Sequence, residues 1–435
     1  MNWTPEQQKA VTSRDTNILV SANAGSGKSV VLVGRIMDFL INDKRNIDEF
    51  LIITYTNAAA AELRAKIIRQ IGAYIRENPT DKHMARQMTR VFNANISTVH
   101  AFCMTVLRQH SHLLGLAPDF TLLNQQDADE LAFQVLDDII EQAYAQPDNQ
   151  PLLELVQAVS DFRSDVGMVN TVFDLFLAAT SSPFPEKWLE DCAREYQIDP
   201  GTDIFGTTWG KYLKTVIKTR LDFAKTGIEA ALDISANEPK PSAIYLLDQA
   251  RFLALEQAID DGFDAFYNCV RSNGNFDRMV VLKNHFDPDT EAYLKDLRDG
   301  YKGIWAKISA LAGAENRVLA EEICGQAPVI QTLVRITLDF KAAFDKKKRD
   351  KNALSFSDLE HLAVKLLVED FDKAQNRVTK TRLAEELSLG FCQVMVDEYQ
   401  DTNLVQDVLF RAVSDGKNLF VVGDVKQSID RKSVV

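Results

Sequence analysis

Residues 17–29 constrain the fold of this 435-residue chain more than any other stretch. Residues 17–20 form a short, largely apolar run that predicts a buried strand. A loop of small residues follows and ends in Gly-Ser-Gly-Lys-Ser at positions 25–29, and an amphipathic helical pattern begins directly after it. Glycine lets backbone N–H groups turn inward onto an anion, and the start of a helix adds partial positive charge at the same point. The stretch therefore predicts a strand–loop–helix unit that binds phosphate groups.

The same stretch is typical of the P-loop that binds nucleoside triphosphates. In that interpretation Lys28 reaches the β- and γ-phosphates and the Ser29 hydroxyl holds Mg²⁺. The general motif begins with glycine, whereas this chain has Ala22, so a plain strand-to-helix turn of an α/β domain is the alternative. The residues expected to contact the nucleotide are Ala22, Asn23, Ala24, Gly25, Ser26, Gly27, Lys28 and Ser29.

Length and composition exclude several classes of protein. A chain of 435 residues is too long for one hydrophobic core and long enough for two or three domains. It contains no run of about 18 uncharged apolar residues, so we expect no membrane span. The five cysteines are odd in number and lack C-x-x-C spacing, which favours a reducing compartment, the cytoplasm, over a zinc site or a disulfide framework.

The charge of the chain is unevenly distributed. A net charge of −13 argues against a coat of basic residues for nucleic acid. Residues 1–115, however, carry 14 Lys and Arg against 9 Asp and Glu, a charge of +5, which leaves −18 on the remainder. We therefore expect any nucleic-acid contact to be local to the first third of the chain, beside an acidic, solvated middle.

Two further strand-to-helix junctions follow the phosphate-binding unit, at residues 50–57 and 95–102. Polar groups at the carboxyl end of a strand lie where α/β sheets bind ligands, and a tyrosine ring offers a face for base stacking. Thr98 and His100 are expected to lie on one face of the third strand. Helix capping and core packing are the alternatives at both junctions. The candidate ligand-facing residues are Tyr55, Thr56, Asn57, Thr98 and His100.

A short helix is predicted just before the phosphate-binding strand. Thr4 and Pro5 are typical of an N-cap followed by proline at the first helical position. Because this helix leads directly to residues 17–29, its polar side chains can lie over a bound nucleotide. The Gln7 amide can both donate and accept, which suits an adenine edge, although a surface helix explains the same residues.

From about Ala117 to Arg349 the pattern is mostly that of amphipathic helices with acidic faces. No internal repeat is visible, and these properties fit an inserted helical domain. The run 346–349 predicts a solvated helix end, with a phosphate contact as the alternative. The expected helices span residues 128–144, 152–162, 166–179, 188–196, 210–232, 243–267, 291–311 and 318–346.

Strand signals return near the end of the chain. Residues 391–396 form a buried strand that delivers Asp397 and Glu398 at its carboxyl end. In a P-loop ATPase the first acid belongs on Mg²⁺ and the second polarises the attacking water. Residues 418–422 predict another buried strand, after which Gln427 is placed to sense the γ-phosphate. We expect the acids and the phosphate-binding loop to come from neighbouring strands.

Together these motifs resemble the UvrD/Rep-like superfamily 1 helicases. Gln7 matches the adenine-reading glutamine of the family's Q motif, and the alanine at position 22 is the family form of motif I. Arg35 matches an arginine that packs on the adenine in such helicases. Residues 55–57, 97–100, 397–401 and 422–429 resemble motif Ia, a further motif that contacts single strands, motif II and motif III, in that order.

Within that family the chain resembles the AddA (RexA) group of helicase–nuclease subunits. The resemblance rests on the long insert between His100 and Phe356, on residues 356–361 and on residues 425–429. It implies an ATP-dependent DNA helicase that uses ATP and Mg²⁺ and translocates on single-stranded DNA. It also implies action on duplex ends in double-strand-break repair and recombination, together with a second protein of the AddB/RexB type.

The resemblance also assigns a role to each candidate residue. Lys28 and Ser29 bind the triphosphate and Mg²⁺, and Asp397 binds Mg²⁺. Glu398 activates water, and Gln427 couples the phosphate to DNA. The residues expected to face the DNA strand are Tyr55, Thr56, Asn57, Thr98 and His100.

After Ile429 the chain departs from the family pattern and stops, so we expect an N-terminal fragment without the second motor domain or the nuclease domain. We predict an α/β, RecA-like parallel-sheet domain from residues 1–115 and 352–435, with an all-helical domain inserted at 116–351. One alternative is a non-motor fragment that binds ATP and DNA without significant turnover. Another is a different P-loop ATPase, such as a repair clamp, which Gln7 and residues 397–401 disfavour.

Overall fold

The computed structural model describes residues 3–21, 27–147, 149–160 and 166–424. The predicted P-loop residues 22–26 and Gln427 lie outside these described residues. Two compact units make up the chain. Unit 1 contains residues 1–149, 159–189 and 335–435, and unit 2 contains residues 150–158 and 190–334.

Unit 1 is built around a five-stranded sheet with the order β1-β9-β8-β2-β3, in which every pair is parallel. This confirms the α/β class and the parallel sheet. One expectation was wrong, because β9 lies between the loop-bearing β1 and the acid-bearing β8. Since parallel strands end at the same edge of a sheet, the carboxyl ends of β1 and β8 still share that edge, where Lys28 lies 3.5 Å from Glu398. The strands are β1 (Ile18–Ser21), β2 (Phe50–Thr54), β3 (Asn95–Thr98), β8 (Gln393–Val396) and β9 (Leu419–Gly423).

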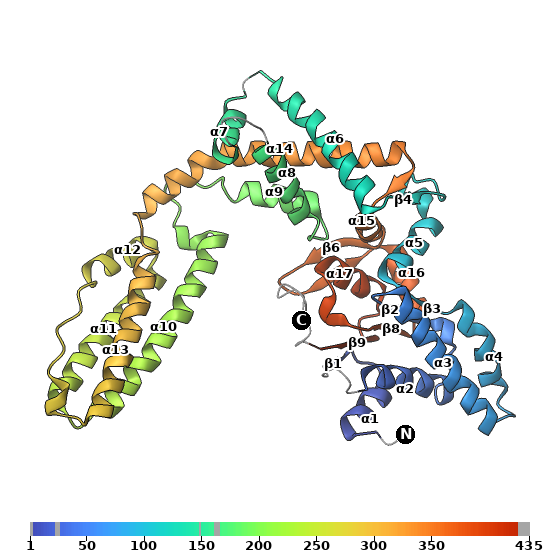
Figure 1. Ribbon diagram of the computed structural model, residues 1–435, viewed down its shortest axis with the longest axis horizontal. Helices are drawn as coiled ribbons and strands as arrows, with labels where there is room; N and C mark the ends of the chain where they lie inside the picture. Colours follow the sequence, from blue (N-terminus) through green and yellow to red (C-terminus); the bar gives the residue numbers. More distant parts are fainter. Residues whose placement is uncertain (1–2, 22–26, 148, 161–165, 425–435) are drawn as a thin grey trace. The chain divides into compact units, whose positions relative to one another are not determined.

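Helices cover both faces of this sheet (Figure 1). In β2, Phe50 and Ile52 join one core cluster while Leu51 and Ile53 join the other. Successive side chains of a strand point to opposite faces, so a strand covered on both sides is a continuous apolar run. One cluster includes α1 (Pro5–Thr12), α2 (Lys28–Ile41), α3 (Asn57–Glu77) and α4 (Lys82–Arg90). The other includes α5 (Val99–Gln109), α15 (Phe356–Leu367), α16 (Arg382–Gly390) and α17 (Leu404–Val413).

The long middle segment starts and ends at one short parallel pair, β4 (Thr121–Leu122) with β5 (Ala353–Leu354). Farther along, β6 (Val368–Asp372) and β7 (Arg377–Lys380) form an antiparallel hairpin that was not predicted. The division into a domain of residues 1–115 and 352–435 with an insert at 116–351 remains a proposal.

The remaining helices of unit 1 pack around phenylalanine rings. The rings of Phe340 and Phe344 stack with centroids 5.7 Å apart. The expected solvated helix end at 346–349 was wrong for Lys348, whose side chain is 2% exposed. Its ammonium pairs with Asp345 at 3.1 Å and Asp358 at 2.6 Å. These helices are α6 (Gln125–Tyr144), α8 (Val166–Ala179), α9 (Pro185–Arg194) and α14 (Asn316–Asp350), and the last two extend into unit 2.

Unit 2 is helical and has its own core around buried Tyr245, Phe252 and Trp305. The single helix expected over 243–267 was wrong. Gly262 breaks it with a φ of +122°, which residues with a Cβ rarely adopt, and the backbone N–H of Phe263 donates to Asp203. Its helices are α7 (Gln150–Val159), α10 (Thr208–Ser235), α11 (Pro239–Asp261), α12 (Phe263–Ser272) and α13 (Pro288–Ser309).

Short 3-10 helices connect several of these elements. They are Ile47–Glu49, Val91–Asn93, Ser111–Leu114, Ile204–Gly206, Leu282–Asn284 and Tyr399–Asp401. Among the helices of the described ranges, none combines the length and apolar character that a membrane span requires.

Candidate nucleotide and nucleic-acid site

Helix α2 begins at Lys28, directly after Gly27. Gly27 has a φ of +87°, a left-handed conformation that is costly for residues with a Cβ. Lys28 and Ser29 therefore stand in the first turn of a helix, where backbone N–H groups lack intrahelical partners. This end of α2 has the chemistry of an anion site.

The Lys28 ammonium lies 3.5 Å from Glu398 Oε2, so the structure brings these two sequence-predicted residues together. The Lys28 side chain is 10% exposed and that of Glu398 is 43% exposed. The lysine is thus largely enclosed, while the glutamate carboxylate is open to water or a ligand.

Asp397 follows β8, the central strand of the sheet, and its backbone N–H donates to the Ile53 carbonyl at 3.0 Å. Burial raises the pKa of the Asp397 carboxyl, and the negative charge of Glu398 raises it further, against the opposing charges of Lys28 and Lys66. A bound cation would favour the charged form of this carboxyl. The position therefore fits a divalent metal.

The donor set around α2 also fits Mg²⁺ in particular. Mg²⁺ is usually held by one or two protein oxygens together with water and phosphate oxygens. Ser29 and Asp397, the residues predicted to hold Mg²⁺, would supply a hydroxyl and a carboxylate to such a site. Within the described ranges, no group of three or more His, Cys, Asp or Glu side chains is arranged to hold a metal by itself.

Gln400 connects the acid pair to the neighbouring strand β9. Its Nε2 donates to Glu398 Oε2 at 2.8 Å, and its Oε1 accepts from the backbone N–H of Asp424 at 2.8 Å. A Cβ on Gly423 would lie 2.9 Å from Gln400 Oε1 and 3.2 Å from the Gln400 backbone nitrogen, so a larger residue here would displace the Gln400 side chain. Sequence reasoning quoted Gln400 within residues 397–401 but gave it no role.

Gln7 lies beside the phosphate-binding turn. Its Nε2 would be 3.7 Å from a Cβ on Gly27. Thr4 and Gln7 form a capping box at the start of α1, in which Gln7 Oε1 accepts from the Thr4 backbone N–H at 3.1 Å. The predicted N-cap with proline at the first helical position is present.

Arg35 does not lie where an adenine could contact it, so its predicted role was wrong. Its side chain is fully buried. Its guanidinium donates to Gln393 Oε1 at 2.6 Å and to the Ala10 carbonyl at 2.7 Å, and it lies over the Phe39 and Phe420 rings. Burial lowers the pKa of Arg35 to about 10. Arg35 therefore holds α1 and α2 to the base of β8.

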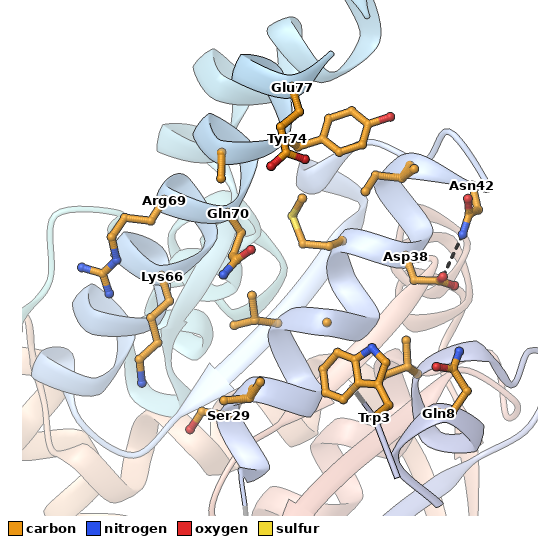
Figure 2. A pocket seen from close by; sticks show the side chains of 17 residues that line it. Trp3, Gln8, Ser29, Asp38, Asn42, Lys66, Arg69, Gln70, Tyr74 and Glu77 are labelled. Atoms are coloured by element: carbon orange, nitrogen blue, oxygen red, sulfur yellow. Dashed lines mark hydrogen bonds between the residues drawn. The ribbon is translucent and has the colours of Figure 1, made fainter. Parts of the chain in front are cut away.

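A groove of about 560 Å³ runs along α2 between α1 and α3 (Figure 2). Ser29 lies at one end, and Asn42 and Glu77 lie toward the other. Lys66, on the α3 wall, acts electrostatically on Asp397, although sequence reasoning gave it no site role. Other labelled lining residues are Trp3, Gln8, Asp38, Arg69, Gln70 and Tyr74.

Tyr55, Thr56 and Asn57 stand together at the carboxyl end of β2. Thr56 caps α3 by accepting from the backbone N–H of Ala59 at 3.0 Å, and Asn57 is the first helical residue. The half-buried Tyr55 donates its hydroxyl to Gln406 Oε1 at 3.3 Å. Burial raises the pKa of Tyr55 above its ordinary value.

Thr98 and His100 do not share a strand face as expected, because β3 ends at Thr98. Thr98 caps α5 by accepting from the backbone N–H of Ala101, which places His100 in the first helical turn. The His100 ring meets the Phe356 ring edge-on, with centroids 5.3 Å apart. Phe356 is 45% exposed and was noted in the sequence only as part of a family marker.

A parallel sheet with a phosphate-binding helix start and an acid pair at one edge defines a P-loop α/β domain. The sequence matches the family described as UvrD/REP helicase N-terminal domain over residues 3–431, and the chain belongs to that family. It is similar to curated proteins whose name designates the A subunit of an ATP-dependent helicase/nuclease. It is 34% identical to the one from Clostridium beijerinckii over 99% of this chain and 35% of the relative.

Two further relatives carry the same name. The protein from Geobacillus thermodenitrificans is 34% identical over 99% of this chain and 35% of the relative, and that from Listeria monocytogenes is 33% identical with the same coverage. The chain therefore spans about a third of the length of the curated relatives it matches.

Proposed function

We propose that this chain is the ATP-binding motor part of a DNA helicase similar to these helicase/nuclease relatives. The observation that carries the proposal is the 3.5 Å approach of Lys28 to Glu398 at the start of α2. This contact unites the phosphate-binding helix with the acid pair, which the sequence separates by 370 positions. An ordinary strand-to-helix turn has no reason to recruit such a pair.

In the proposed site the triphosphate binds at the N-terminal end of α2, where Lys28 contacts its β- and γ-phosphates. Ser29 and Asp397 hold Mg²⁺, which when bound neutralises charge on the phosphates. Lys28 can pair with a phosphate or with Glu398. Phosphate binding therefore draws Lys28 away and leaves the Glu398 carboxylate to orient water and accept its proton.

The nucleoside is proposed to lie beside Gln7, toward the Ser29 end of the groove along α2. The position of Gln7 next to Gly27 supports this placement. Lys66 adds a positive charge near the same end of the groove. The contacts of residues 22–26 with ATP, and of Gln427 with the γ-phosphate, stay proposals from the sequence.

Single-stranded DNA is proposed to contact the edge formed by Tyr55, Thr56, Asn57, Thr98 and His100. To these we add Phe356, since its exposed ring and the His100 ring offer surfaces on which bases can stack. The relatives are named as one subunit of a helicase/nuclease. For the whole protein we therefore also propose a partner of the AddB type, action at duplex ends, and a role in repair and recombination. A cytoplasmic location belongs to the same proposal.

Equilibrium binding of a fluorescent ATP analogue with Mg²⁺ tests the nucleotide site in this chain. We expect binding by the unmodified chain, loss of binding with Lys28→Ala, and little turnover by this part alone. Equal affinity of the unmodified chain and of Lys28→Ala for the analogue would reject the proposed nucleotide site. In the longer protein, turnover stimulated by single-stranded DNA would support the motor, and ATP binding without such turnover would favour the alternative of a binding protein without turnover.

A further inference from the structure

Glu360 is a buried carboxylate beneath the surface proposed to bind DNA. It projects from α15, which packs against both α5 and α17, and it is only 6% exposed. A buried negative charge is costly unless hydrogen bonds compensate it, and it does not favour a nearby polyanion. A carboxylate at this position therefore requires a specific set of partners.

Two of those partners come from different helices. His100 Nε2, on α5, lies 3.3 Å from Glu360 Oε1, and Gln406 Nε2, on α17, donates to the same oxygen at 2.7 Å. Burial pushes the pKa of Glu360 upward, but the hydrogen bonds from His100 and Gln406 outweigh it and the net pKa is lowered. The carboxylate is thus held in its charged, accepting form.

Gln406 extends the connection to Tyr55. Its Oε1 accepts from the Tyr55 hydroxyl at 3.3 Å, while its backbone N–H donates to Asn403 Oδ1 at 2.8 Å. The side-chain amide is therefore held by two hydrogen bonds, and the backbone of the same residue by a third. Tyr55 and His100 come from separate strand-to-helix junctions. His100 contacts the Glu360 carboxylate directly, and Tyr55 is connected to it through Gln406.

The first turn of α17 also reaches the acid pair of the nucleotide site. Asp407, next to Gln406, is fully buried and accepts from the Tyr399 hydroxyl at 2.6 Å. Tyr399 follows Glu398 directly in the sequence. The same helical turn thus contacts the nucleotide-site segment through Asp407 and the proposed DNA surface through Gln406.

We propose that Glu360 is a positioning residue that holds His100 directly, and Tyr55 through Gln406 of α17, in one fixed arrangement that is ready to contact single-stranded DNA. This inference rests on the proposed function, in which Tyr55 and His100 face the strand. Glu360 itself makes no DNA contact, and it acts through Gln406 and through the His100 ring.

The test compares Glu360→Leu with Glu360→Gln in this chain, using fluorescence anisotropy of a labelled oligothymidylate. Leucine matches the volume but accepts no hydrogen bond, so we expect the dissociation constant to rise about tenfold, on the order of one lost base-stacking contact. Glutamine keeps a carbonyl oxygen that can accept from Gln406 Nε2 and from the His100 Nε2–H, as Glu360 Oε1 does, so affinity within about threefold of the unmodified chain is expected.

A core variant of the same helix serves as the matched control. Leu367 is fully buried in α15 and contacts neither His100 nor Gln406 in the hydrogen-bond network, so Leu367→Ala should lower the unfolding temperature and leave DNA affinity unchanged. If Leu367→Ala weakens DNA binding as much as Glu360→Leu at matched stability, the positioning role is overturned and only a structural role remains.

A double-mutant cycle tests whether Glu360→Leu weakens DNA binding through Tyr55 and His100. In a background of Tyr55→Phe with His100→Ala, Glu360→Leu should add less than about a twofold loss, because residues acting through one another are not additive. A full tenfold loss in that background would overturn the inference. No binding of oligothymidylate by the unmodified chain would instead reject the proposed DNA site itself.

Discussion

Lys28 and Glu398 meet across a 3.5 Å gap at the carboxyl edge of the sheet. Glu398 reaches this contact from a left-handed backbone conformation, with a φ of +54°. Residues other than glycine adopt that region at a cost, and such outliers concentrate at functional sites. The turn after β8 thus brings the Glu398 carboxylate to Lys28, one residue after Asp397, the proposed metal ligand.

Glu398→Gln in the full-length context should retain MgATP binding and lose turnover. The amide keeps a hydrogen-bond acceptor near Lys28 but cannot take a proton from water, so we expect a loss of about 10²–10⁴ in DNA-stimulated kcat. Steady-state phosphate release and nucleotide affinity, measured on the same preparation, check both parts. Unchanged turnover would remove Glu398 from the proposed role.

Asp397→Asn should stabilise the chain at neutral pH when no nucleotide or Mg²⁺ is added. The raised pKa of Asp397 means that folding favours its protonated form. The free energy of unfolding that the protonated carboxyl contributes is fully present at pH values below the ordinary aspartate pKa of 3.8. It is lost as the pH rises through the higher pKa of Asp397 in the folded state. The stability advantage of the variant should therefore shrink as pH falls.

Urea unfolding of both proteins across this pH range measures that difference. Comparing the two proteins cancels the titration of shared groups, including Glu360, whose lowered pKa acts in the opposite direction. A variant that is less stable than the unmodified chain at neutral pH would contradict the prediction. Added MgATP should stabilise the unmodified chain more than Asp397→Asn.

Arg35→Met should destabilise unit 1 rather than alter base selection. The methionine fills space but leaves the Ala10 carbonyl and the buried Gln393 amide without their donor, at a cost of about 3 kcal/mol. Arg45→Met is the control, because its exposed pair with Glu49 should contribute about 0.5 kcal/mol or less. A changed ATP-to-GTP affinity ratio at unchanged stability would restore the adenine contact for Arg35.

Phe356→Ala should weaken binding of single-stranded DNA about tenfold, on the scale of one base–aromatic stack. The ring is 45% exposed, so the free energy of unfolding should change little. Phe223, which is 76% exposed and belongs to unit 2, provides a matched alanine control. Equal effects of the two substitutions would argue against a specific role for Phe356.

Local sequence patterns were enough to predict the α/β class, the strands of the parallel sheet and the helical character of the middle segment. The reason is that strand and helix periodicities act over a few residues. Residues 50–53, for example, are apolar throughout because both faces of β2 are covered. Family motifs placed Lys28, Asp397 and Glu398 in one proposed site before any geometry was known.

Contacts between segments that are distant in the sequence decided the strand order and the surroundings of the site residues. The insertion of β9 between β1 and β8, the burial of Arg35 against Gln393 and the convergence of His100 and Gln406 on Glu360 all join residues far apart in the chain. No local periodicity encodes such pairings, because they depend on which side chains fill a shared interior and satisfy its polar groups. The sequence by itself therefore determined the elements and the motif residues, whereas tertiary packing alone decided which of those residues remain open to a ligand.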